Sequence, residues 1–424
     1  MIKRLAFLLL LVTSAIAQTP QGTALDAALA LPALWETPAA SWVEGNQQLG
    51  FRWISAAHNI AQSTLKDATF LGQPVCQTIL RCEADKIVEL NVLFYNRGDM
   101  GEINSVQYGD LIKKTIAAIS AATQMTFTPK KRDPANVVKA DGVSWTTPVS
   151  TYLLEYSCTK SPAFRSEFVR LQIIPTPKPK NLVQEALDNA KKQSARFRGL
   201  DHVTRDSASG DVVIKDVPMV DQGQKGYCVV ATAERVMRYY GIKTDEHELA
   251  QLANSDAEKG TNYNAMTESL KKLTARLKIR VRSLCDIDYG STVNDYNLAA
   301  KRARVNPVNI GAGDASVVFS QMKPEILRES RNKSRAAFGS FQRQIKTRID
   351  DGIPLLWSVM LGVLDTDGSH AKSPGGHTRL IIGYNEKTSE ILYSDSWGAG
   401  HELKRMSASD AWTISHGLVT IEPI

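Results

Sequence analysis

Two apolar segments within residues 377–397, HTRLIIGY and EILYSDSW, constrain the fold of this chain more than any other feature. Both are rich in β-branched and aromatic residues, and the polar run NEKTS between them is typical of a turn. We therefore expect an antiparallel hairpin in which the start of the first strand lies beside the end of the second. Tyr384 is expected to lie near Glu390. In that register His377 and Asp395 come within about two residues of facing each other, so that an imidazole and a carboxylate can meet.

The second strongly patterned segment is DQGQKGYCVVATAERVMRYYG at residues 221–241, and it contains Cys228. The apolar residues that follow Cys228 share one helical face, and Gly241 supplies the stop. They are Val229, Val230, Ala233, Val236, Met237 and Tyr240. Cys228 is therefore predicted at a helix N-terminus, where unpaired N–H groups and the helix dipole favour an anion. A thiol there has a lowered pKa and is a better nucleophile, although buried structural cysteines are also common in helices.

A thiolate nucleophile needs a base, and the base needs a group that orients it. His377 and Asp395 would supply both, and the glycines before His377 leave the imidazole accessible. Taken singly, His377 is interpreted as a polar residue at a strand end and Asp395 as a turn carboxylate. The catalytic hypothesis therefore depends on both residues meeting Cys228. His370 is an alternative base, but it does not start the hairpin strand.

Several of these motifs resemble a known superfamily. QGQKGYC matches the Gln-Gly-x-x-Gly-x-Cys element of papain-like cysteine peptidases, and DSWG is similar to their Asn-Ser-Trp-Gly segment with Asp in place of Asn. The segments RYYGIKTDEHELAQLA, GTNYNAMTESLKKL and IDDGIPLLWSV resemble the C39-like branch, in which the third triad member is usually an Asp. The resemblance covers roughly residues 212–424 and does not extend to the N-terminal half.

The resemblance implies a papain-like domain, in which the helix bearing the nucleophile packs on an antiparallel sheet. It implies that Cys228 is the nucleophile, that His377 is the general base and then the acid, and that Asp395 orients His377. Gln222 would donate to the oxyanion hole, an interaction worth roughly 2.7–4 kcal/mol per donor. Without the resemblance, Gln224 is an equally good candidate. Neither a cofactor nor a metal is implied.

Three further residues bear on the resemblance. Trp397 resembles the Trp that covers the His–carboxylate pair in relatives. Val229 stands where papain commonly has a Trp, and Lys225 stands in place of its extra loop cysteine. These two departures make papain-like substrate preferences doubtful but leave the triad intact.

The whole chain is predicted to be of α+β class, with a smaller α+β N-terminal domain at residues 41–175. That domain contains four strand-like segments and the helical run YGDLIKKTIAAISAATQM. Residues 176–211 hold a proline-rich linker, PTPKPKN, and an amphipathic helix. Residues 212–424 form the peptidase-like domain. The N-terminal domain, whose role is unknown, is expected to dock substrate, attach to the envelope or inhibit the peptidase.

The first 17 residues, MIKRLAFLLLLVTSAIA, have the basic start, apolar run and small-residue site of a secretory signal peptide. Cleavage is expected after Ala17. No later run is long and apolar enough to span a membrane. We therefore expect a secreted or periplasmic protein with no transmembrane segment in the mature chain.

Charge and cysteine content limit the remaining function classes. The formal charge is +7, but the basic residues are scattered and have no interleaved aromatic residues, so no nucleic-acid partner is expected. Five cysteines leave at least one thiol free in an oxidising compartment. Pairing is open among Cys76, Cys82, Cys158 and Cys285, with one internal disulfide expected in the N-terminal domain. Cys228 is expected to be free.

Two short motifs are not assigned a function. The tripeptide RGD at residues 97–99 can be an integrin ligand, but in YNRGDMG it is interpreted as a polar turn after a strand. DTDGSH at residues 365–370 lacks the later ligands of a full calcium loop and is interpreted as a lip beside the active site.

The sequence therefore predicts an exported cysteine peptidase that hydrolyses a protein or peptide substrate through a Cys-His-Asp triad and a thioester. Two alternatives stay open. The same triad can act as an amidase or transpeptidase on cell-wall peptides, or the domain can be a non-catalytic peptide-binding module. A complete triad disfavours the binding module, because binding alone does not require all three residues.

Overall fold

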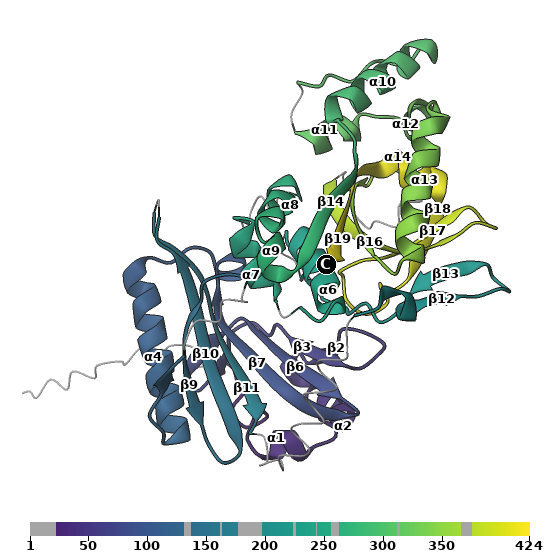
Figure 1. The fold of residues 1–424 in the computed structure, drawn as a ribbon. Coiled ribbons are helices and arrows are strands. Elements are labelled where there is room, and N and C mark those ends of the chain that lie inside the picture. The colour runs from purple at the N-terminus through teal and green to yellow at the C-terminus, as the bar shows by residue number, and fades with distance from the viewer. Residues whose placement is uncertain are drawn as a thin grey trace, which may run out of the picture.

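The structure is a computed structural model in which two sheets account for most of the strands (Figure 1). It describes residues 23–130, 137–161, 163–176, 197–223, 226–242, 244–255, 263–311, 314–365 and 375–424. The predicted signal peptide and nearly all of the predicted linker and amphipathic helix lie outside the described residues.

The N-terminal sheet has eight strands, and all its neighbouring strands pair antiparallel. In pairing order they are β2 (Arg52–Trp53), β3 (Ile60–Ser63), β6 (Gln77–Glu83), β7 (Lys86–Asn96), β11 (Arg165–Pro175), β10 (Ser150–Thr159), β9 (Asp141–Thr146) and β8 (Thr128–Pro129). Helix α4 (Ser105–Thr123) runs along one face (Figure 1). It begins at a capping box in which Asn104 and Gln107 bond each other's backbone N–H groups.

Smaller elements complete this half. A three-stranded sheet joins β1 (Thr23–Ala24), β4 (Ala68–Phe70) and β5 (Gln73–Val75), and the short helices are α1 (Ala33–Glu36), α2 (Ala39–Gly45), η1 (Gln47–Leu49) and α3 (Arg97–Met100). Leu25, Leu29 and Leu34 are buried in the same core as the large sheet. The packed N-terminal unit therefore includes residues before position 41.

The C-terminal sheet carries the predicted hairpin. In pairing order its strands are β12 (Val203–Arg205), β13 (Asp211–Ile214), β16 (Gly375–Asn385), β15 (Leu355–Leu361), β19 (Ser415–Pro423) and β14 (Ile279–Asp286), with β17 (Glu390–Ser394) paired to β16 and to β18 (Lys404–Ser407). Its helices are η2 (Gly199–His202), α6 (Cys228–Tyr239), α7 (Glu246–Leu252), α8 (Tyr263–Lys272), α9 (Thr274–Leu277), α10 (Tyr289–Arg302), α11 (Ala315–Ser320), α12 (Pro324–Asn332), α13 (Arg335–Asp350) and α14 (Ala408–Ile414). Helix α6 packs against β16. The predicted α+β class, with the Cys228 helix on an antiparallel sheet, is confirmed.

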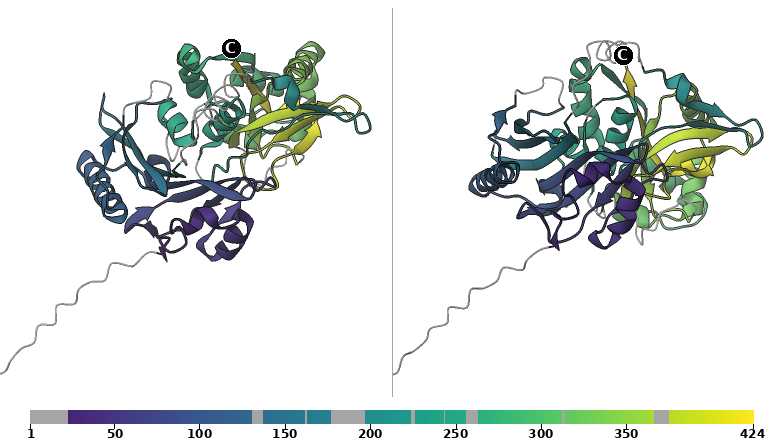
Figure 2. Two further views of the ribbon diagram at one scale, coloured as in Figure 1. Left: turned by 60° about the horizontal axis from the view of Figure 1, so that its bottom comes forward. Right: turned by 90° about the horizontal axis from the view of Figure 1, so that it is seen from below.

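The two halves pack directly against each other, with α7 lying between the two sheets (Figures 1 and 2). Side chains alternate along β11: Val169 and Leu171 are buried in the N-terminal core, whereas Phe168 belongs to the core of the C-terminal half. Arg170, also on the second face, bonds Glu248 of α7 at 2.5 Å. One face of the N-terminal sheet is therefore covered by α4 and the other by the C-terminal half.

The described cysteines correct one expectation. No disulfide joins any of the five cysteines, so the internal disulfide expected in the N-terminal domain is not formed. Cys82 is buried, and burial together with the charge of Asp85 raises the pKa of its thiol to about 11. Among the helices of the described ranges, none has the length and apolarity needed to cross a membrane.

Candidate active site

Helix α6 presents Cys228 at its first residue, as predicted. The N-cap residue, Tyr227, makes no side-chain capping bond, so the first-turn N–H groups are not satisfied by a cap. The predicted apolar face is buried, and Gly241 follows the helix with a φ of +75°. Cys228 itself is only partly buried.

A second, polar stripe on α6 faces the hairpin. Thr232 and Arg235 lie four and seven residues after Cys228 and therefore share its side of the helix. The Thr232 hydroxyl donates to the Thr378 carbonyl at 3.3 Å. The Arg235 guanidinium is fully buried and donates to the Pro218 carbonyl and to the Ser394 hydroxyl, at 2.8 and 2.5 Å. This stripe fixes α6 against the strands that carry the histidine and the carboxylate.

The hairpin brings His377 and Asp395 into contact. Leu380 pairs with Ser394 across β16 and β17, so Asp395 follows the last paired residue close to the position of Arg379. His377 is two residues from that position, as the predicted register required. The distance from His377 Nε2 to Asp395 Oδ1 is 2.6 Å. Tyr384 pairs with Ile391 rather than Glu390, a difference of one residue that a bulge near Gly383 accommodates.

His377 also bonds the thiol of Cys228, and the three groups change one another's proton affinity. Burial favours the neutral thiol, but the hydrogen bond and charge of His377 hold the pKa of Cys228 below its ordinary 9.0. Burial alone would lower the pKa of His377, whereas Asp395 and Cys228 raise it to about 9. These opposite shifts favour transfer of a proton from the thiol to the imidazole.

A buried arginine lies on the far side of the carboxylate. Arg379 Nε donates to Asp395 Oδ2 at 2.9 Å, and both side chains are completely buried. The Asp395 Oδ1 atom also accepts the Ser396 N–H at 3.1 Å. Burial raises the pKa of Asp395, but His377 and Arg379 outweigh it and hold that pKa below its ordinary value.

Trp397 and Gln222 lie beside this group. The Trp397 ring stacks on the His377 imidazole with centroids 4.7 Å apart, as expected for a side chain that covers the pair. The Gln222 N–H donates to the Ser396 carbonyl at 3.0 Å. The Gln222 side chain is buried, and its Oε1 has no hydrogen-bond partner among the described residues. Gly223 follows with a φ of +66°, a conformation that favours glycine and turns the loop toward α6.

The N-terminal half touches the loops on both sides of the site. Arg52 forms an ion pair with Asp221, the residue before Gln222, at 3.0 Å. The Ala56 N–H donates to Glu402 in the loop that follows Asp395, also at 3.0 Å.

The RGD motif forms another contact between the halves. It forms the short helix α3 directly after β7. Arg97 is buried and bonds Glu167 and the Ser255 carbonyl, which belongs to the C-terminal half. Gly98 packs so closely on Tyr227 that an added Cβ would lie 2.1 Å from the tyrosine Oη. The motif follows a strand as interpreted, but its arginine lies in an interface rather than in solvent.

Arg379 and Arg235 were missed by the sequence analysis, although each carries a signal. Arg379 is a charge inside an apolar strand, two residues from His377 and therefore on the same face. Arg235 continues the polar stripe that begins at Cys228. The apolar patterns that predict α6 and β16 include neither residue.

The other sequence candidates contribute nothing to the described geometry. Gln224, Lys225, His370 and all of DTDGSH except Asp365 lie outside the described residues. Within the described ranges, no group of three or more His, Cys, Asp or Glu side chains is arranged to hold a metal.

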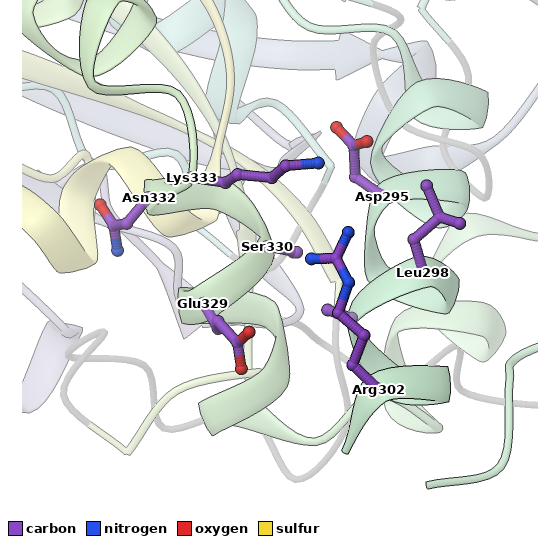
Figure 3. A pocket seen from close by; sticks show the side chains of 8 residues that line it. Asp295, Leu298, Arg302, Glu329, Ser330, Asn332 and Lys333 are labelled. Atoms are coloured by element: carbon purple, nitrogen blue, oxygen red, sulfur yellow. The ribbon is translucent and has the colours of Figure 1, made fainter. Parts of the chain in front are cut away.

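A separate hollow of about 300 Å³ lies between α10 and α12 (Figure 3). It is lined by Asp295, Leu298, Ala299, Arg302, Glu329, Ser330, Asn332 and Lys333. Neither helix carries a residue of the Cys–His–Asp group.

Comparison with known proteins finds one matching family model. Residues 214–418 match the model of the Peptidase_C39 like family. No curated protein matches the chain. The peptidase domain of Streptococcus ComA, a bifunctional ABC transporter involved in quorum sensing, is 14% identical with a TM-score of 0.27, over 49% of this chain and 100% of that domain. Xylellain, a cysteine protease from Xylella fastidiosa, is 14% identical with a TM-score of 0.28, over 52% of this chain and 90% of that protein.

The predicted resemblance to the C39-like branch is therefore confirmed for the C-terminal half. Within residues 214–418 this chain is similar to the Peptidase_C39 like family, and this half is of cysteine-peptidase type.

Proposed function

We propose that this protein is an exported cysteine peptidase that hydrolyses peptide bonds with Cys228, His377 and Asp395 as its triad. The observation that carries the proposal is the buried imidazole of His377, which bonds the Cys228 thiol and the Asp395 carboxylate at the N-terminus of α6. A purely structural histidine does not require a nucleophile on one side and a carboxylate on the other.

In the first half-reaction the Cys228 thiolate attacks the carbonyl carbon of the peptide bond, and the carbonyl oxygen becomes an oxyanion. The N–H of Cys228 and the side-chain amide of Gln222 are the proposed donors to that oxyanion. His377, as an imidazolium, then protonates the amine as the C–N bond breaks. The products are a thioester on Cys228 and a free amine.

In the second half-reaction water attacks the thioester while neutral His377 removes a proton from that water. The C–S bond breaks, the carboxylic acid leaves, and the thiolate–imidazolium pair is restored. Asp395 remains ionised in both halves and holds the imidazole in the orientation that these proton transfers need. No step requires a redox change.

The alkylation rate of Cys228 from pH 4 to pH 9 tests the proposal without knowledge of the substrate. The full-length chain without its first 17 residues is treated with iodoacetamide, and peptide mapping separates Cys228 from the other four cysteines. We expect rapid labelling of Cys228 well below the ordinary thiol pKa of 9.0, and loss of this reactivity in His377→Ala. An ordinary thiol profile in the unmodified chain would contradict the proposal.

Hydrolysis of labelled casein then separates a peptidase from a reactive thiol without turnover. The unmodified chain is expected to release peptides with new C-termini, and Cys228→Ala is expected to release none. Products that contain a new cross-link instead of a new C-terminus would indicate transpeptidation.

We also propose that the domains divide near the boundaries that the sequence suggested, 41–175 and 212–424, with the segment that contains Leu25, Leu29 and Leu34 packed on the first domain. The close packing between the halves supports an N-terminal domain that stays attached to the peptidase rather than one that is released.

A further inference from the structure

Arg379 has a position that the proposed chemistry does not use. It comes from the same strand and the same face as His377, and it reaches the carboxylate oxygen that His377 does not. Its guanidinium lies over the Tyr393 ring, 4.6 Å from the centroid. A completely buried arginine is expensive to desolvate, so its retention beside a buried carboxylate calls for a physical reason.

The hydrogen bonds of Asp395 supply one part of that reason. Its Oδ1 atom accepts from His377 Nε2 and from the Ser396 N–H, at 2.6 and 3.1 Å. Its Oδ2 atom accepts from Arg379 Nε at 2.9 Å. Because each oxygen has its own donors, rotation of the carboxylate would break bonds on both sides. Arg379 therefore fixes the plane in which Asp395 meets the imidazole.

Charge supplies the other part. A thiolate, an imidazolium, a carboxylate and a guanidinium follow one another from Cys228 to Arg379, and their charges sum to zero. Without Arg379 this buried row would have a net charge of −1. A low-dielectric site relieves such a charge by taking up a proton, and Asp395, having lost its cation, is the group expected to take it.

The other charged groups near the carboxylate do not replace Arg379. Arg235 approaches from α6. Burial lowers the pKa of its guanidinium, and the charges of Asp395 and Glu402 partly oppose that effect. Its hydrogen bonds, however, go to the Ser394 and Ser396 hydroxyls and to the Pro218 carbonyl. Arg235 therefore fixes the backbone around the site, whereas Arg379 bonds the carboxylate itself.

We propose that Arg379 is a positioning residue that keeps Asp395 ionised and turned toward His377 over the pH range in which the site is reactive. This inference rests on the proposed function. Arg379 touches neither the thiol nor the substrate carbonyl in the proposed mechanism, and it acts through Asp395 alone.

The test measures the pH at which the rate of Cys228 alkylation by iodoacetamide falls on the acid side. We call this pH the low-pH edge. In Arg379→Gln we expect this edge to move to higher pH by about one unit, which lowers the labelling rate about tenfold on the acid side. The lost charge makes Asp395 more basic, so at low pH the carboxylate is neutralised and the imidazolium that stabilises the thiolate loses its partner. In Arg379→Lys the edge is expected to stay close to its wild-type pH, because this variant retains a buried cation.

Arg331→Gln is the matched control for general destabilisation. Arg331 is also an arginine that stacks on an aromatic ring, Trp412, but it is only partly buried and bonds carbonyl oxygens. It belongs to α12 and has no bond to Asp395 in the structure. We expect it to lower the melting temperature and leave the low-pH edge unchanged.

A double-mutant cycle keeps the test valid if Arg379→Gln alone folds poorly. Asp395→Asn removes the carboxylate, so adding Arg379→Gln to it should not move the edge further. An edge that stays at the wild-type pH in Arg379→Gln, or an equal shift with and without the carboxylate, would overturn the inference. A wild-type chain without any low-pH reactivity would instead overturn the proposed function.

Discussion

The N-terminal sheet buries Arg170 among carboxylates, and the C-terminal sheet buries Arg379 beside one. Arg170 bonds Glu155 of its own sheet at 2.8 Å and Glu248 of α7 at 2.5 Å, and it also contacts Asp245. Burial raises the pKa of Glu155, but Arg170 and Lys130 outweigh it and hold that pKa below its ordinary value. The cluster around Arg170 therefore joins the two halves through ion pairs.

The cluster around Arg379 differs in one respect. Its carboxylate, Asp395, bonds the imidazole of His377, which in turn bonds the thiol of Cys228. Both the imidazole and the thiol titrate between acid and alkaline pH. The same arrangement, an arginine from a sheet strand that bonds a buried carboxylate, thus lies at an interface in one half and at the Cys–His–Asp group in the other. What distinguishes them is the residue that the carboxylate contacts next.

The largest effect is expected from Asp395→Asn, which leaves the site sterically similar but removes its central charge. Loss of the carboxylate should lower activity on casein by roughly 10³–10⁴-fold, because the imidazole loses both its orientation and its charge partner. The pKa of His377 should fall from about 9 toward 6.5, so the alkaline limb of the pH profile moves to lower pH. The pH dependence of casein hydrolysis measures both changes.

The corresponding change in the other cluster is Arg170→Met. It leaves three carboxylates without their shared cation and should lower the free energy of unfolding by about 3 kcal/mol. The folded pKa of Glu155 lies below its ordinary 4.5, so this stabilisation is present above pH 4.5 and is lost as the pH falls through the folded value. Urea unfolding at pH 7 and pH 3 should show a larger difference between wild type and variant at pH 7 than at pH 3. A shifted alkylation edge for Cys228 in this variant would break the comparison.

A smaller effect is expected where α3 meets the nucleophile helix. Gly98→Ala places a Cβ against Tyr227 Oη, and the overlap should cost about 1–3 kcal/mol. Gly109→Ala is the matched control, because nothing lies within 4 Å of its Cβ and it is within α4. Thermal melts should show destabilisation in the first and none in the second, since alanine favours a helix over glycine. Equal melting temperatures in the two variants would mean that Tyr227 moves aside at no cost.

The smallest effect is expected for Arg52→Ala. Its side chain is 59% exposed, and exposed ion pairs contribute at most about 1 kcal/mol. We expect a stability change within about 1 kcal/mol and a casein hydrolysis rate within about twofold of wild type at moderate salt. A larger loss of rate with unchanged stability would indicate that this ion pair sets the position of the Gln222 loop.

Local patterns in the sequence were enough to predict the helix that begins at Cys228 and the contact between His377 and Asp395. Both depend on a single element or on two strands joined by a short turn, where periodicity and register decide the geometry. The α+β class of the chain was predictable for the same reason.

Contacts between distant segments were not predictable. Strands β3, β6 and β9 were missed, and so was the docking of α7 on β11. Apolar and polar residues alternate along β11 from Val169 to Ile173, so its sequence indicates that the face of Arg170 is exposed to solvent, although α7 packs on it. Arg170 and Glu248 are 78 residues apart, and no local rule joins them.

Strand β16 carries both cations of the site on one face, and this has a consequence for how the gene can change. Side chains alternate along a strand, so inserting or deleting one residue between Arg379 and the turn would rotate His377 and Arg379 to the opposite face together. The length of the turn between β16 and β17 is under no such constraint, because it lies beyond the paired residues. Length variants among descendants of this gene should therefore accumulate in the turn and be purged from the strand, even where the inserted residue is apolar and fits the core.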